Sequence, residues 1–147
     1  MGLIEDLAEG PVGVDTAPFI YFIEGDSRYA PILESLFALA AHGTRHLVTS
    51  ALTLMELLVV PYRAGNQQLA DQYEALLTRS RGLQMVDLSR EVLRGAAQLR
   101  AVTGARTPDA IQLAAALMSG CRTFVTNDRR LPAIPGLKLI QLSDYVT

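Results

Sequence analysis

Short runs of apolar, often β-branched residues alternate with longer segments whose apolar residues recur every three or four positions. The short runs are typical of buried strands, and the longer period is typical of helices with one buried face. Strands separated by helices favour a parallel sheet covered on both faces, so the alternation predicts an α/β domain. The strands are expected at Val12–Asp15, His46–Thr49, Gln84–Asp87, Thr123–Thr126 and Lys138–Gln141.

Helices are expected between these strands. The helical segments are Ala17–Glu24, Pro31–Ala41, Ala51–Arg63, Gln67–Arg79, a helix between Ser89 and Gly104, and one between Thr107 and Gly120. Ser50 and Thr107 are expected to cap the helices that follow them, because a hydroxyl accepts a hydrogen bond from a free N–H of the first turn. The length of 147 residues, with no linker, predicts a single domain over residues 1–147.

Composition limits the classes of function. Hydrophobic residues make up 50% of the chain and the net charge is −2, so we expect surplus apolar surface and only a local patch for nucleic acid. The single cysteine, Cys121, excludes an intrachain disulfide and a cysteine-based zinc site, and is expected in the core. His42 and His46 are expected in a solvated turn. No secretory pattern and no membrane-length apolar window occur, which predicts a cytoplasmic protein without membrane contact.

Four acidic residues lie where the surroundings make a carboxylate costly. Asp15 closes one apolar strand and Asp128 follows another. Glu56 interrupts the apolar segment 52–60, and Asp109 opens an apolar helix. A buried carboxylate needs a cation, hydrogen bonds or a proton, and no lysine lies near any of the four in the sequence. A hard divalent metal ion is the simplest partner that they can share.

The predicted topology allows these acids to meet. In open parallel sheets, ligands bind beyond the carboxyl ends of the strands. Asp15 and Asp128 follow the first and fourth strands, and Glu56 lies about two turns into the helix after the second strand. Asp109 begins the helix that runs back along the sheet towards the fourth strand, which puts it at the same edge. We therefore expect one site.

Each acid also has a purely structural explanation. Asp15 is placed to cap a helix, Asp109 suits the positive end of a helix dipole, and Asp128 suits an Asx turn. Glu56 is the hardest to explain in this way, although a helix face can simply expose it to water. The occurrence of all four together favours a functional site.

Four segments carry a family resemblance. They are Val14–Gly25, Ser50–Leu57, Thr107–Ala116 and Phe124–Leu131. In this order and spacing they resemble a PIN-domain ribonuclease, and most closely the VapC toxins of toxin–antitoxin pairs. The resemblance covers nearly the whole chain. It departs at Ala17, where many members have a serine, and in the residues ahead of Val12, which are more than a minimal member has.

The resemblance implies a three-layer α/β/α fold with a central, mainly parallel sheet of four to five strands. It implies an endoribonuclease in which Asp15, Glu56, Asp109 and Asp128 hold Mg²⁺ or Mn²⁺. Thr126 matches the small hydroxyl residue two positions before the last acid. The resemblance also implies a homodimer and a cognate antitoxin protein as partner.

The chemistry of phosphodiester hydrolysis suggests roles for these residues. Divalent ions can supply the attacking hydroxide, relieve charge on the phosphoryl oxygens and stabilise the leaving group. We hypothesise that Asp15 and Asp109 bind the first ion, while Glu56 and Asp128 complete the site or orient the water. Thr126 would hold a carboxylate or a bound water.

Side chains near the acids are candidates for the substrate. Arg106, Arg129 and Arg130 flank the acids and are candidates to bind RNA phosphates, although a solvated surface explains them about as well. Gln112 lies one helical turn after Asp109 and is a candidate to face the site.

Two functions from other classes stay open. A receiver-like phosphoacceptor would also place Asp15 at a strand end, but it needs a paired acid and a lysine, and Lys138 is the only lysine. A binding-only PIN fold would act in a repressor complex without cleaving RNA. Cleavage of RNA that a chelator abolishes would separate the nuclease from both.

Overall fold

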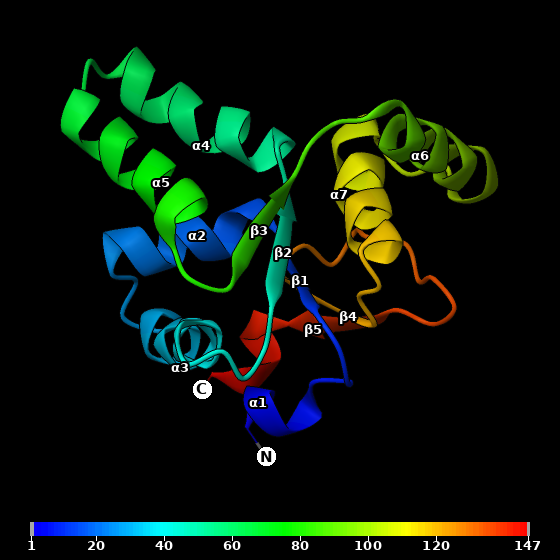
Figure 1. Ribbon diagram of the computed structural model, residues 1–147, viewed down its shortest axis with the longest axis horizontal. Helices are drawn as coiled ribbons and strands as arrows, with labels where there is room; N and C mark the ends of the chain where they lie inside the picture. Colours follow the sequence, from blue (N-terminus) through cyan, green and yellow to red (C-terminus); the bar gives the residue numbers. More distant parts are fainter. Residues whose placement is uncertain (1, 147) are drawn as a thin grey trace.

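The centre of the protein is a five-stranded sheet, in a computed structural model that describes residues 2–146 (Figure 1). Its strands are β1 (Val12–Val14), β2 (Leu47–Ser50), β3 (Leu83–Val86), β4 (Thr123–Thr126) and β5 (Lys138–Gln141). All neighbouring strands are parallel, in the order β3-β2-β1-β4-β5. The five predicted strands are confirmed. β4 and β5 match to the residue, β1 ends one residue earlier than expected, β2 is shifted by one residue toward the C-terminus, and β3 is shifted by one residue toward the N-terminus.

Helices connect the strands. They are α1 (Leu3–Asp6), α2 (Thr16–Glu24), α3 (Ala30–Ala41), α4 (Leu52–Arg63), α5 (Gln67–Arg79), α6 (Arg90–Thr103), α7 (Thr107–Met118) and the 3-10 helix η1 (Leu142–Tyr145). Each predicted helix is present within about two residues of its expected ends. The short α1 and η1 have no counterpart among the predicted elements, because four residues carry no readable period.

Two predicted helix caps are wrong. Ala51 precedes α4 as its N-cap residue and Arg106 precedes α7, and neither side chain makes a capping hydrogen bond. Ser50 remains in β2, and its hydroxyl donates to Gln112 Oε1 at 2.8 Å instead. Thr107 is already the first helical residue of α7. A long-range partner has therefore replaced the local cap at Ser50.

The two faces of the sheet are covered by different helices, which confirms the three-layer α/β/α fold. Val12 and Val14 of β1 pack into a core with side chains of α2, α3 and α5. Gly13, between them, faces α7: a Cβ atom added there would lie 2.9 Å from the Cβ of Ala116 and 2.7 Å from Cδ1 of Phe124. The small residue lets α7 approach the sheet closely, and α6 packs against α7 on the outside (Figure 1).

The strand order places a crevice beside Asp15. The chain adds β2 and β3 on one side of β1, and then β4 and β5 on the other, so the order reverses between β1 and β4. The backbone N–H of Asp15 donates to Val125 O at 2.9 Å and continues this pairing past the end of β1. Such a reversal, at the carboxyl ends of parallel strands, is where α/β sheets bind ligands.

Several expectations for single residues are also confirmed. Cys121 is a buried free thiol at the junction of α7 and β4, and His42 and His46 are exposed. Apolar surface remains on α4, where the exposed fractions are 58% for Met55 and 64% for Val60. Among the helices of residues 2–146, none combines the length and hydropathy that crossing a membrane requires.

Candidate active site

Asp15 lies at the centre of the candidate site, where β1 ends and α2 begins. It is the N-cap residue of α2, and its Oδ1 accepts a 2.8 Å hydrogen bond from the backbone N–H of Thr16. Its Oδ2 accepts a 2.7 Å hydrogen bond from the hydroxyl of Thr126. Burial raises the pKa of Asp15; these two hydrogen bonds oppose the shift, and the nearby carboxylates of Glu56 and Asp109 add to it. The capping role is real, but it leaves a half-buried acid among other acids.

Thr126 links two of the predicted site residues. It is the last residue of β4 and is fully buried. Its hydroxyl donates to Asp15 and accepts a 3.0 Å hydrogen bond from the backbone N–H of Asp128. One side chain therefore fixes both the Asp15 carboxylate and the backbone that carries Asp128.

Glu56 reaches the same edge of the sheet from α4. Its Oε1 accepts a 2.6 Å hydrogen bond from the hydroxyl of Thr16, the residue that follows Asp15. The Nε2 group of Gln112 lies 3.4 Å from the same oxygen. The structure thus brings Glu56 next to the start of α2. The hydroxyl of Thr16 therefore supports Glu56, although position 17 is an alanine and offers no hydroxyl.

Gln112 organises the floor of the site. Its side chain is buried, and its Oε1 accepts a 2.8 Å hydrogen bond from the Ser50 hydroxyl. Its Nε2 donates to Thr53 at 2.8 Å and to Thr16 at 3.2 Å. These bonds join β2, α2 and α4 to α7, the helix that carries Asp109. The amide of Gln112 therefore positions the elements on which the acids stand.

Arginines hold the other two acids. Arg106 places Nε 3.1 Å from Asp109 Oδ2 and Nη2 3.8 Å from Asp128 Oδ2, so it spans both carboxylates. Arg130 donates to Asp128 Oδ1 from its side-chain Nε at 3.0 Å and from its backbone N–H at 2.9 Å. The side-chain hydrogen bond from Arg130 is the main cause that lowers the pKa of Asp128. The backbone bond is the Asx turn expected at Asp128.

Arg129 points away from these acids. Its Nη2 donates to Ser143 at 2.8 Å and pairs with Asp144 in η1. Of the three arginines expected to flank the acids, the structure therefore brings Arg106 and Arg130 to them and turns Arg129 elsewhere.

The donor set suits a hard divalent ion, although the side chains do not enclose one. Across residues 2–146, no three histidine, cysteine, aspartate or glutamate side chains lie close enough together to hold a metal ion as they stand. Glu56 and Asp109 nevertheless lie close enough to Asp15 to raise its pKa. Carboxylate oxygens supported by hydroxyls are the ligands that Mg²⁺ and Mn²⁺ prefer, and the chemistry of this site fits them.

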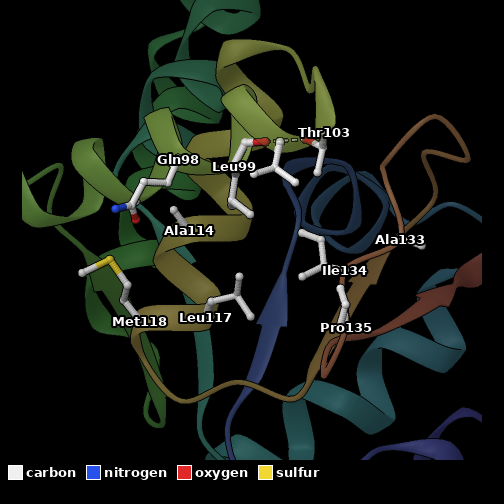
Figure 2. A pocket seen from close by; sticks show the side chains of 11 residues that line it. Gln98, Leu99, Thr103, Ala114, Leu117, Met118, Ala133, Ile134 and Pro135 are labelled. Atoms are coloured by element: carbon white, nitrogen blue, oxygen red, sulfur yellow. Dashed lines mark hydrogen bonds between the residues drawn. The ribbon is translucent and has the colours of Figure 1, made fainter.

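Two hollows near α7 differ in chemistry. One, of about 390 Å³, lies between α6, α7 and residues 133–135 (Figure 2). Its lining includes Leu117, Ile134 and Pro135 and contains no ionisable side chain. The other, of about 160 Å³, lies beside the acids. Its lining residues are Thr103, Gly104, Ala105, Arg106, Asp109, Arg130 and Pro132. Only the second carries charges that suit an anionic substrate.

Lys138 does not lie where a receiver-like site would need its lysine. It begins β5, at the amino edge of the sheet, and its Nζ donates to Asp6 O at 2.7 Å. Asp15 follows the carboxyl end of β1. The receiver-like alternative therefore lacks its lysine beside the aspartate.

Three hydroxyl residues of the site were not expected from the sequence. Thr16 is adjacent to Asp15, and this adjacency is the one signal that points to it. Ser50 and Thr53 take part through Gln112, which is 62 and 59 positions away respectively. No local pattern carries that information.

Comparison with known proteins gives the family. The PIN domain model matches residues 12–137. VapBC2 from Rickettsia felis, bound to a DNA fragment from its promoter, is similar in fold, with a TM-score of 0.69, 20% identity, and 89% of this chain and 98% of that chain covered. A toxin–antitoxin complex from Klebsiella pneumoniae has a TM-score of 0.65 at 20% identity, covering 89% and 97%.

A third similar structure is VapC20 of Mycobacterium tuberculosis, a toxin that cleaves the sarcin-ricin loop. It has a TM-score of 0.65 at 15% identity, and the match covers 82% of this chain and 92% of that chain. Among curated proteins, none matches the sequence. At these identities the solved structures show a shared fold, while the domain model covers most of the chain. Together with the five-stranded parallel sheet, the match over residues 12–137 shows that this chain belongs to the PIN domain family.

Proposed function

We propose that this protein is a metal-dependent endoribonuclease and the toxin of a type II toxin–antitoxin pair. The observation that carries the proposal is Asp15, a half-buried acid whose pKa is raised next to Glu56 and Asp109 at the reversal point of the sheet. Acids gathered in this way are stabilised by a cation. Among proteins of this fold, VapC20 is a toxin that cleaves the sarcin-ricin loop, which supports the same class of reaction.

The four acids would hold the metal. Asp15 and Asp109 would bind the first ion, and Glu56 and Asp128 would complete the site or orient water. A bound Mg²⁺ or Mn²⁺ supplies charge neutralisation at the phosphoryl oxygens and a nucleophile at neutral pH. The protein's own contribution is orientation: Thr126 holds the Asp15 carboxylate at 2.7 Å. Hydrogen bonds from residues next to the metal ligands fix the direction of those ligands.

Arg106 and Arg130 would bind the phosphates of the RNA. Both line the hollow beside Asp109, and their forked guanidinium groups match the geometry of phosphate oxygens. With a net charge of −2 the whole chain does not attract RNA, so this local pair of cations is the contact that we expect. Arg129 pairs with Asp144 and lies outside this contact.

Partners are part of the proposal. A toxin of this class would bind an antitoxin protein, and a toxin–antitoxin complex from Klebsiella pneumoniae has the same fold. A homodimer would bury apolar surface, and α4 exposes Met55, Val60 and Tyr62 by 58%, 64% and 55%. These side chains support such a contact, because patches of this kind mark interaction sites. The expected location is the cytoplasm.

A cleavage assay tests the proposal. Purified protein is incubated with a mixture of structured RNAs in Mg²⁺ or Mn²⁺, with and without EDTA. We expect cleavage that EDTA stops, that added metal restores and that Asp15→Asn abolishes. Asp144→Asn is the matched control, since this exposed acid pairs with Arg129 outside the site. Cleavage that survives in Asp15→Asn would overturn the assignment, and a metal-loaded protein that binds an antitoxin but cuts no RNA would favour the binding-only fold.

A further inference from the structure

We propose that Arg106 and Arg130 exchange partners as the site fills. In the structure they pair with Asp109 and Asp128. When a divalent ion takes over these carboxylates, the two guanidinium groups turn to a phosphate of the RNA. This proposal rests on the proposed function, because it requires the acids to bind a metal ion. The binding of metal and the binding of phosphate are then coupled through the side chains of Arg106 and Arg130.

In the structure, the cations that contact Asp109 and Asp128 are arginine side chains. Arg106 approaches Asp109 to 3.1 Å and Asp128 to 3.8 Å, and Arg130 approaches Asp128 to 3.0 Å. A metal ion bound by the same carboxylate oxygens would compete with these ion pairs. The arginines are therefore competitors of the ion as long as no anion is available to them.

Both arginine side chains are mostly exposed to solvent. Their exposed fractions are 59% and 71%, whereas those of Asp109 and Asp128 are only 16% and 22%. Exposed ion pairs contribute little free energy, since water and salt screen them. The cost of breaking these pairs is therefore small, and the acids stay in place while the long side chains rotate.

A receiving site lies next to them. The hollow of about 160 Å³ is lined by Arg106, Arg130, Asp109 and residues 103–105, which connect α6 to α7. Its volume is several times the ~30 Å³ that one water molecule occupies in the liquid, so a phosphate group fits. Guanidinium groups released into this hollow find oxygen acceptors in the geometry that they prefer.

This exchange makes the two ligands cooperative. Metal binding frees the arginines for the phosphate, and a phosphate that holds the arginines frees the carboxylates for the metal. Thermodynamic linkage requires the two effects to be equal in size. A site without this exchange would bind metal equally well with and without an anion.

The first experiment measures Mn²⁺ affinity by calorimetry in a chloride buffer without RNA. Wild type is compared with Arg106→Gln, Arg130→Gln and the double variant. Arg129→Gln is the matched control, because it removes the same charge from a neighbouring residue that touches none of the four acids. We expect each variant to bind Mn²⁺ up to about fivefold more tightly, as relief of an exposed ion pair implies, and the control to match wild type.

The second experiment repeats the titration with sulfate as a tetrahedral anion, at an ionic strength matched with chloride. Sulfate should tighten Mn²⁺ binding to wild type and to Arg129→Gln, and should leave the double variant unchanged. Equal Mn²⁺ affinity in wild type and the double variant, or no effect of sulfate, would overturn the exchange. Asp15→Asn separates the two proposals: Mn²⁺ binding that depends on Asp15 but not on the arginines rejects the exchange alone. Binding that does not depend on Asp15 rejects the metal site as well.

Discussion

The hydroxyl of Thr126 donates a 2.7 Å hydrogen bond to Oδ2 of Asp15, across 111 positions of sequence. Thr126 ends β4 and Asp15 follows the neighbouring strand β1, at the point where the strand order reverses. The bond therefore sets the direction of the half-buried Asp15 carboxylate.

Replacing Thr126 by valine keeps the shape of the side chain and removes its donor. We expect the cleavage rate to fall by about 10- to 100-fold, which is typical when the support of a ligand is lost. The free energy of unfolding should fall by about 1–3 kcal/mol, because a buried carboxylate loses a hydrogen bond. Thr123→Val is the control: Thr123 is also buried in β4, but accepts from Ala8 N at 2.9 Å at the opposite edge. An equal loss of activity in both variants would contradict the assigned role.

Replacing Asp15 by asparagine should abolish cleavage and yet stabilise the fold at neutral pH. Burial and neighbouring acids raise the pKa of Asp15 above its ordinary value of 3.8, so the charged form is disfavoured in the folded protein. Its contribution to stability is fully present below the unfolded pKa and is lost as the pH rises through the folded pKa.

The stability of Asp15→Asn relative to wild type should therefore grow as the pH rises above about 4 and vanish in more acidic solution. Urea unfolding of both proteins between acidic and neutral pH measures this difference. A variant that is less stable than wild type at neutral pH would show that the charge of Asp15 is not penalised.

Replacing Gln112 by leucine removes the amide beneath the site. Ser50 and Thr53 would each lose a 2.8 Å hydrogen bond, and Glu56 would lose a nearby donor. We expect about 2 kcal/mol less free energy of unfolding and a lower cleavage rate, because the buried hydroxyls are left with fewer partners. Gln98→Leu, on the exposed surface of α6, should change neither quantity appreciably. Urea unfolding and initial cleavage rates of both variants provide the measurement.

Two glycines facing α7 should respond in opposite ways to alanine. A Cβ atom at Gly13 would lie 2.7 Å from the Phe124 ring, and we expect overpacking to cost about 1–3 kcal/mol. At Gly95 in α6 the nearest atom is the sulfur of Met118 at 3.2 Å, on a flexible and exposed side chain. Alanine there should stabilise by about 0.5–1 kcal/mol through helix propensity. Thermal unfolding of both variants tests the close approach of α7 to the sheet.

Cys121 should be inert in the folded protein. Burial raises the pKa of its thiol to about 12, so almost no thiolate is present at neutral pH. We expect no reaction with a thiol reagent at pH 8 until denaturant is added, followed by rapid modification. Fast labelling of the native protein would show that the junction of α7 and β4 opens readily.

Local patterns in the sequence predict the helices and strands and single out the four acids. Strand and helix periods are local properties, so they predict β4 and β5 to the residue, and their alternation predicts the parallel sheet. The four acids stand out because charge in an apolar setting is costly wherever the chain folds. That they hold a metal ion is still a prediction.

The partner of each polar side chain depends on the tertiary structure. Ser50 bonds to Gln112 and does not cap α4, and Arg129 turns to Asp144 while Arg130 turns to Asp128. Neighbouring residues of the same type thus receive different partners. A long-range hydrogen bond needs its donor and acceptor atoms within about 3 Å of each other. That distance is set by how distant helices and strands pack together, and no local sequence period encodes it.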